Sequence, residues 1–139
     1  MAEANVPRDA VMALMRASDR TRRTMVRVLQ AFELTLPQFN VLIILRREPE
    51  LPTLEVATRL VEETPGITRL MNTLAAKRYI RRRRSDGDAR VQLCSLTATG
   101  RKLIDVVIPK LKAAQAAMMK DLSAEEAATL IALLKKFAV

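Results

Sequence analysis

The stretch RRRRSDGDAR at residues 81–90 is the most informative part of this chain, because it joins a turn sequence to five arginines. Tyr79 and Ile80 precede it, and residues 91–95 alternate between Val, Leu or Ser and Gln or Cys after it. The Ser-Asp-Gly-Asp segment in its middle is typical of a tight turn. Together these features predict a β-hairpin whose charged tip projects from the domain surface.

The five arginines of this hairpin repel one another unless solvent or a polyanion neutralises them. The planar donor fork of arginine suits phosphate, so the expected partner is nucleic-acid backbone. A solvated charge run without a partner is the alternative, but such runs usually lie in tails and not between two apolar β segments. Residues 69–90 contain eight basic and two acidic residues, a net charge of +6 out of the chain's +9. Most of the net positive charge is therefore concentrated in residues 69–90 and is not spread over the chain.

The remaining composition excludes several classes of protein. The chain has no run of about 18 apolar residues, and residues 1–5 do not resemble a signal peptide, so we expect a cytoplasmic protein without a membrane span. There is no histidine and one cysteine, Cys94, which removes the usual zinc ligand sets, an internal disulfide and most general-base chemistry. We therefore expect that the protein is not an enzyme and binds no metal or cofactor. We expect Cys94 to be a packing residue.

Two short helices are predicted directly before the hairpin. Thr53 is the expected N-cap of a helix over residues 54–60, and Thr64 that of a second helix, which opens with Pro65 and extends to about Lys77. The short connection between them forces a sharp angle. Two short helices at a tight turn followed by a basic hairpin are typical of a winged helix-turn-helix, whose second helix enters the major groove.

The second of these helices has one apolar and one polar face. Ile67, Leu70, Met71 and Leu74 form the apolar face, which leaves its other positions exposed. Arginine and asparagine recognise guanine and adenine edges bidentately. Ordinary surface residues would show the same pattern in isolation, and the neighbouring wing favours DNA recognition. The candidate contacts on the exposed face are Gly66, Thr68, Arg69, Asn72 and Thr73.

Long amphipathic helices are predicted at both ends of the chain. Apolar or small residues recur every three or four positions from residue 8 to about 34, and again from 98 to about 120. Pro109 should bend or split the second helix. Ser123 and Glu126 form a capping box that opens a last helix. Such stripes exceed what a small winged domain must cover, which favours a shared dimer interface, although packing within one chain would leave the same pattern.

The sequence therefore predicts a mainly α fold with a small β-hairpin. A winged helix-turn-helix DNA-binding region is expected over residues 35–97, and residues 1–34 and 98–139 are expected to form a helical dimerisation region. The DNA-binding region opens with a helix for which Thr35 and Gln38 form a capping box.

Several of these motifs resemble the MarR family of bacterial transcription regulators. LTLPQ at residues 34–38 looks like the family's L-T-x-x-Q opening, and GITRLM at 66–71 is similar to its recognition helix. Asp88-Ala89-Arg90, followed by LTATG at 96–100, matches the D-x-R and L-T-x-x-G wing signature at the family's spacing. The resemblance covers about residues 34–103.

The resemblance implies an obligate homodimer that represses nearby genes by binding double-stranded DNA at a pseudo-palindromic operator. It also implies that Arg90 enters the minor groove, that Asp88 braces the wing, and that Arg82 lies on the first wing strand. The family often has Gly where this chain has Arg78, so either Arg78 is left-handed or the helix exit differs. The candidate DNA-binding residues are Thr64, Pro65, Gly66, Thr68, Arg69, Asn72, Arg82, Arg84 and Arg90.

The face of the wing that meets DNA follows from strand alternation. Arg82 and Arg84 should share one face of the strand, and Arg81 and Arg83 the other, so the four cannot all touch the same phosphates. If the family placement of Arg82 holds, its face contacts the DNA backbone.

The resemblance implies a small phenolic or aromatic ligand that releases the repressor, but the sequence identifies neither the ligand nor its pocket. Arg20, Arg22 and Arg23 are candidates to meet a ligand carboxylate and are equally compatible with a solvated surface. Two other classes of function stay open. One is a sequence-nonspecific architectural DNA-binding protein, which would bind operator and random DNA equally. The other is a helical protein-interaction module, which would not bind DNA at low salt.

Overall fold

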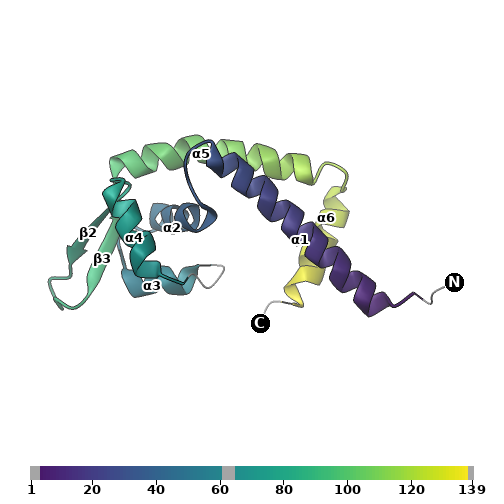
Figure 1. Cartoon of the computed structure of the whole chain (residues 1–139), viewed down its shortest axis with the longest axis horizontal. Coiled ribbons are helices and arrows are strands. Elements are labelled where there is room, and N and C mark those ends of the chain that lie inside the picture. The colour runs from purple at the N-terminus through teal and green to yellow at the C-terminus, as the bar shows by residue number, and fades with distance from the viewer. Residues whose placement is uncertain (1–3, 61–64, 138–139) are drawn as a thin grey trace.

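The computed structural model describes residues 4–60 and 65–137 (Figure 1). Over these residues the chain is mainly helical, with one small sheet. None of the described helices is long and apolar enough to cross a membrane. The elements are α1 (Val6–Gln30), α2 (Leu36–Arg47), β1 (Leu51–Pro52), α3 (Thr53–Arg59), α4 (Ile67–Ala76), β2 (Ile80–Arg84), β3 (Gln92–Leu96), α5 (Ala98–Met118) and α6 (Ala124–Lys135).

The sheet confirms the predicted hairpin and adds a strand to it. β2 and β3 pair antiparallel, with Ile80 opposite Leu96 and Arg84 opposite Gln92. The additional strand is β1, which pairs with β3 through Leu51 opposite Cys94 and gives the order β1-β3-β2. A two-residue strand beside prolines has no periodicity of its own, so only its pairing with β3 defines it.

The core lies where α2 meets α4, α5 and the sheet. Three α2 side chains, Val41, Leu42 and Leu45, are fully buried. The predicted capping box at the start of this helix is confirmed: the Gln38 amide N–H donates to Thr35 Oγ1 at 3.2 Å, and the Thr35 amide N–H donates to Gln38 Oε1 at 3.0 Å. Burial of Val41, Leu42 and Leu45 away from water stabilises the fold. The other buried apolar residues are Leu29, Leu34, Phe39, Leu51, Val56, Met71, Leu74, Ile80, Cys94, Ile104, Val107 and Leu111.

Two predicted helix starts are wrong. Thr53 is the first residue of α3 and not its cap. Its Oγ1 lies 3.3 Å from Cys94 Sγ and 3.4 Å from the Gln92 carbonyl oxygen, so the hydroxyl contacts β3 instead of capping the helix. α4 begins at Ile67 and not at Pro65, because Gly66, with φ of +73°, forms the left-handed N-cap. Thr64, the other predicted cap, lies outside the described residues.

The predicted long helix α5 is one continuous helix. Thr97 Oγ1 caps it by accepting from the Gly100 N–H at 3.0 Å. Pro109 lies inside the helix without splitting it, and Figure 1 shows α5 as a bowed helix. Arg78, at the exit of α4, has φ of +63°. This confirms the first of the two predicted alternatives, that an arginine adopts the left-handed conformation at the position where the MarR family often has Gly.

α1, α6 and the far half of α5 extend away from the winged part (Figure 1). α6 begins at the predicted capping box of Ser123 and Glu126 but has no buried residue. Packing within one chain therefore leaves apolar side chains of α6 and of the first half of α1 exposed, whereas the second half of α1 packs against the core. The large apolar side chains exposed on α1 and α6 are Val6, Val11, Met12, Met15, Leu130, Ile131, Leu133 and Leu134.

Candidate nucleic-acid interface

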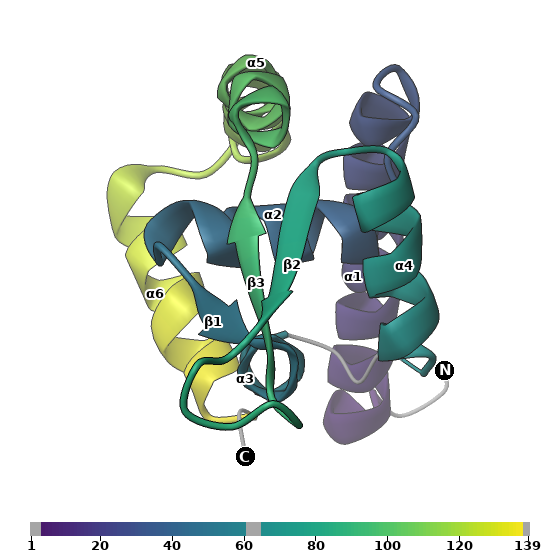
Figure 2. The same ribbon diagram turned by 90° about the vertical axis from the view of Figure 1, so that its left-hand side faces the viewer.

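α4 presents the polar face that its sequence predicts. Met71 and Leu74 are buried and Ile67 and Leu70 are half-buried, so the helix is held by its apolar side. On the other side Thr68, Arg69 and Asn72 are exposed, as are Pro65 and Gly66 before the helix, whereas Thr73 is half-buried. Figure 2 shows α4 beside the hairpin of β2 and β3, at the same end of the molecule.

A short hydrogen bond joins the helix to the wing. Arg82 Nη1 donates to Asn72 Oδ1 at 2.6 Å. Two candidate residues, ten positions apart in the chain, are thereby brought together. Because the acceptor is a neutral amide, the bond orients the Arg82 guanidinium and leaves its positive charge uncompensated.

A cavity of about 400 Å³ lies between α3, α4 and the hairpin. Arg82 and Arg90 reach it from the wing, Thr68 from α4 and Leu54 from α3. Leu54 is 79% exposed. The side of the hairpin that carries Arg82 is therefore the side that faces the recognition helix.

The wing tip is held by contacts around Asp88. Asp88 Oδ1 accepts from the backbone N–H of Arg90 at 3.0 Å and from Arg90 Nε at 3.2 Å. The side-chain and backbone hydrogen bonds from Arg90 lower the pKa of Asp88. The Arg90 side chain is 91% exposed, so its guanidinium lies at the surface while its carboxylate partner holds the turn.

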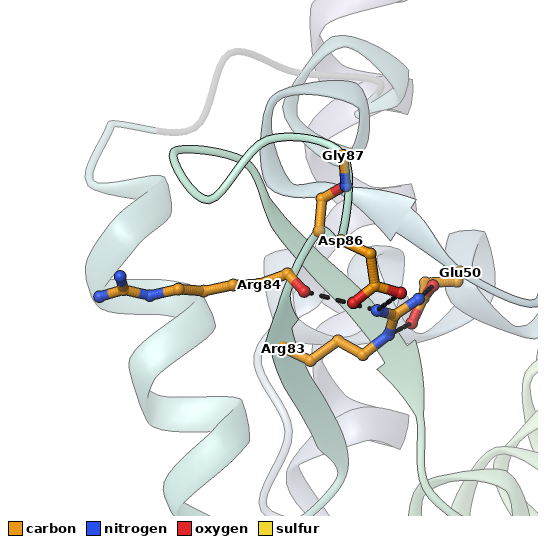
Figure 3. A network of polar contacts seen from close by, with 6 residues as sticks. Glu50, Arg83, Arg84, Asp86 and Gly87 are labelled. Atoms are coloured by element: carbon orange, nitrogen blue, oxygen red, sulfur yellow. Dashed lines mark hydrogen bonds and ion pairs between the residues drawn. The ribbon is translucent and has the colours of Figure 1, made fainter.

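Arg83 turns to the opposite side, toward Glu50 (Figure 3). Its Nε and Nη2 donate to the two Glu50 carboxylate oxygens at 2.9 and 2.7 Å. Figure 3 shows Arg84 extending away from Glu50, as strand alternation predicts. Among the described carboxylates, none is paired with Arg81, Arg82 or Arg84. Sequence reasoning missed Glu50, since no local signal connects it with a residue two strands away.

Cys94 is fully buried in β3, which confirms its prediction as a packing residue. Burial raises the pKa of its thiol, and the Thr53 hydroxyl contact only partly opposes this effect. A thiol held in its protonated form is a poor nucleophile.

Comparison with known proteins agrees with this architecture. The sequence model of the MarR family matches residues 32–91. An uncharacterised HTH-type transcriptional regulator from Bacillus cereus is 29% identical over 115 residues, which cover 83% of this chain and 76% of the relative.

Solved structures share the whole fold. A mutant of MarR from E. coli in complex with operator DNA superposes with a TM-score of 0.86 at 24% identity, over 100% of both chains. BpsR from Bordetella bronchiseptica, whose structure concerns regulation of DNA binding by 6-hydroxynicotinic acid, superposes with a TM-score of 0.83 at 22% identity, over 94% of this chain and 99% of that one.

The winged helix-turn-helix and these matches define a DNA-binding transcription regulator. Within that class, this chain is similar to the MarR family, over residues 32–91 in sequence and over the whole chain in fold.

Proposed function

We propose that this chain is a homodimeric, sequence-specific repressor that binds a pseudo-palindromic operator in the cytoplasm. The observation that carries the proposal is the Arg82–Asn72 hydrogen bond, which joins the exposed side of α4 to the wing arginines as one continuous surface. Such a surface suits a helix in the major groove with a wing on the flanking backbone. The proposal includes no catalytic role.

The candidate residues take different parts in this complex. Arg69 and Thr68, exposed on α4, contact base edges in the major groove. Arg82 and Arg84 contact phosphates, and Arg90 at the exposed tip enters the minor groove, where narrow A·T-rich segments concentrate negative potential. The other proposed DNA contacts are Thr64, Pro65, Gly66 and Asn72, with Asp88 as the wing support.

The helices at the two chain ends form the proposed dimerisation region, residues 1–34 and 98–139, with residues 35–97 as the DNA-binding region. Ile131 is 55% exposed and Phe137 66% exposed in the single chain, so a second copy would remove apolar surface from water. Two winged regions related by a two-fold axis match the symmetry of a pseudo-palindromic site.

A small aromatic or phenolic acid is the proposed effector. A cavity of about 340 Å³ lies between α2 and α5, with Phe39 and Ile108 among its apolar lining residues and Arg46 and Lys112 among its cations. A pocket lined by both apolar side chains and cations suits an aromatic ring that carries a carboxylate. The DNA binding of BpsR, which has a similar fold, is regulated by the aromatic acid 6-hydroxynicotinic acid, and this supports the same class of ligand here. Arg46 is paired with Asp105 at 3.0 Å and Arg23 of α1 with Asp19 at 2.6 Å, so Arg47 and Lys112 are the stronger candidates to meet the carboxylate.

Genomic footprinting, followed by titration of the footprinted site and of random DNA at fixed salt, tests the proposal. We expect a discrete two-fold site that is bound at least 10³-fold more tightly than random DNA, the lower end of the usual range of about 10³ to 10⁷. Equal affinities would favour an architectural protein. No binding to either DNA at low salt would favour a protein-interaction module.

A further inference from the structure

Glu50 reaches across the sheet to an arginine of the wing. It stands one residue before β1, and β3 lies between β1 and β2. Both of its carboxylate oxygens accept hydrogen bonds from Arg83, at 2.7 and 2.9 Å. Such a bidentate pair is stronger and more directional than a single contact. Glu50 is 30% exposed and Arg83 47%, so the pair lies at the surface but is partly shielded (Figure 3).

Every nitrogen of the Arg83 guanidinium faces an oxygen of the protein. Nε and Nη2 are taken by Glu50, and Nη1 lies 3.4 Å from the Arg84 carbonyl oxygen and 3.6 Å from Asp86 Oδ2. The hydrogen bond and the charge of Glu50 raise the pKa of Arg83. Arg83 therefore has no uncompensated charge, and its Nε and Nη2 donors are already engaged by Glu50.

The neighbouring arginines differ in this respect. Arg82 is held by the neutral amide of Asn72, and Arg84 extends away from Glu50 (Figure 3). Arg82 lies on the side of the hairpin that faces α4. Strand alternation puts Arg84 on that same side and Arg83 on the other. A complex with a fixed register on the operator would keep the Arg82 side against the backbone.

We infer that Glu50 is a specificity-determining residue, which withholds Arg83 from phosphate and so limits binding to random DNA. This inference rests on the proposed DNA-binding function. Non-specific binding is almost wholly electrostatic and has no fixed register, so a released Arg83 could reach phosphates there. At the operator, the fixed register keeps Arg83 away from the phosphates that Arg82 contacts. Releasing Arg83 from Glu50 therefore adds little to the affinity for the operator.

The test is Glu50→Gln, which keeps the shape and one acceptor oxygen but removes the charge. Binding to a random duplex and to the operator is measured by fluorescence anisotropy between 50 and 200 mM NaCl. On random DNA we expect the slope of log affinity against log salt to steepen by about 0.9 for each wing engaged, which is about a 3.5-fold greater loss per wing over this range. The operator slope should stay close to that of the wild type.

Two further variants serve as controls. Glu48→Gln makes the same change in net charge, but Glu48 pairs with Arg59 of α3 at 2.8 Å, away from the wing, so the random-DNA slope should not change. The double variant Glu50→Gln with Arg83→Gln replaces a neutralised pair by two neutral amides. Because the native pair already has no net charge, its random-DNA slope should equal the wild-type slope.

Three results would overturn the inference: an unchanged random-DNA slope for folded Glu50→Gln, an equal steepening for Glu48→Gln, or a shallower slope for the double variant. The last would mean that Arg83 already binds phosphate, and it decides the matter even if Glu50→Gln fails to fold. Absence of salt-dependent DNA binding by the wild type would refute the proposed function instead, so the two failures are distinguishable.

Discussion

Replacing Arg82 by alanine tests which face of the wing meets DNA. Arg82 faces α4, bonds Asn72 at 2.6 Å and lines the same cavity as Thr68 and Arg90, whereas Arg81 is exposed on the other face of the strand. If Arg82 contacts one phosphate, its loss lowers the salt slope by about 0.9 per wing, or about 1.8 for a dimer with both wings engaged. Binding should weaken to a similar degree on all sequences, because phosphate contacts carry no base information.

The assay is a salt titration of operator binding for the wild type, Arg82→Ala and Arg81→Ala. Arg82→Lys separates charge from orientation: it keeps the cation, so the slope should hold, while the loss of the arginine fork that meets Asn72 lowers the affinity at every salt concentration. An unchanged slope for Arg82→Ala together with a reduced slope for Arg81→Ala would mean that the opposite face of β2 binds DNA.

Three other predictions concern separate parts of the molecule. Arg69→Ala should cost about 1–3 kcal/mol at the operator and relax the base preference at one position, whereas equal losses on operator and random DNA would assign Arg69 to the backbone. Deletion of residues 123–139 should cause dissociation or aggregation, and a truncated protein that stays dimeric and equally stable in ultracentrifugation and thermal melting would reject this interface. The hydrogen bonds from Arg90 lower the pKa of Asp88, so their contribution is present at pH 7 and is lost as the pH falls below about 4. A lower protection of the Arg90 amide proton, relative to its intrinsic exchange rate, is expected below that pH and at pH 7 in Asp88→Asn, and pH-independent protection would contradict it.

Features that depend on near neighbours in the chain could be predicted from the sequence. The capping box of Thr35 and Gln38 spans three residues, and the apolar face of α4 follows from helical periodicity, so both are present as predicted. The hairpin needed only a turn sequence between two β segments. These features are local, because the atoms that stabilise them lie within a few residues of one another.

For side chains that have several available partners, the partner depends on how the helices and strands pack. Threonine is a favoured helix-capping residue. The hydroxyl of Thr53 instead contacts Cys94 and the Gln92 carbonyl oxygen, both on β3. Of four consecutive arginines, Arg83 is neutralised by Glu50, 33 residues away, because the strand order β1-β3-β2 brings the start of β1 within side-chain reach of β2 across β3. Electrostatic and hydrogen-bond energies depend on distances of a few ångströms, and for residues far apart in the chain only the packing of the elements sets those distances.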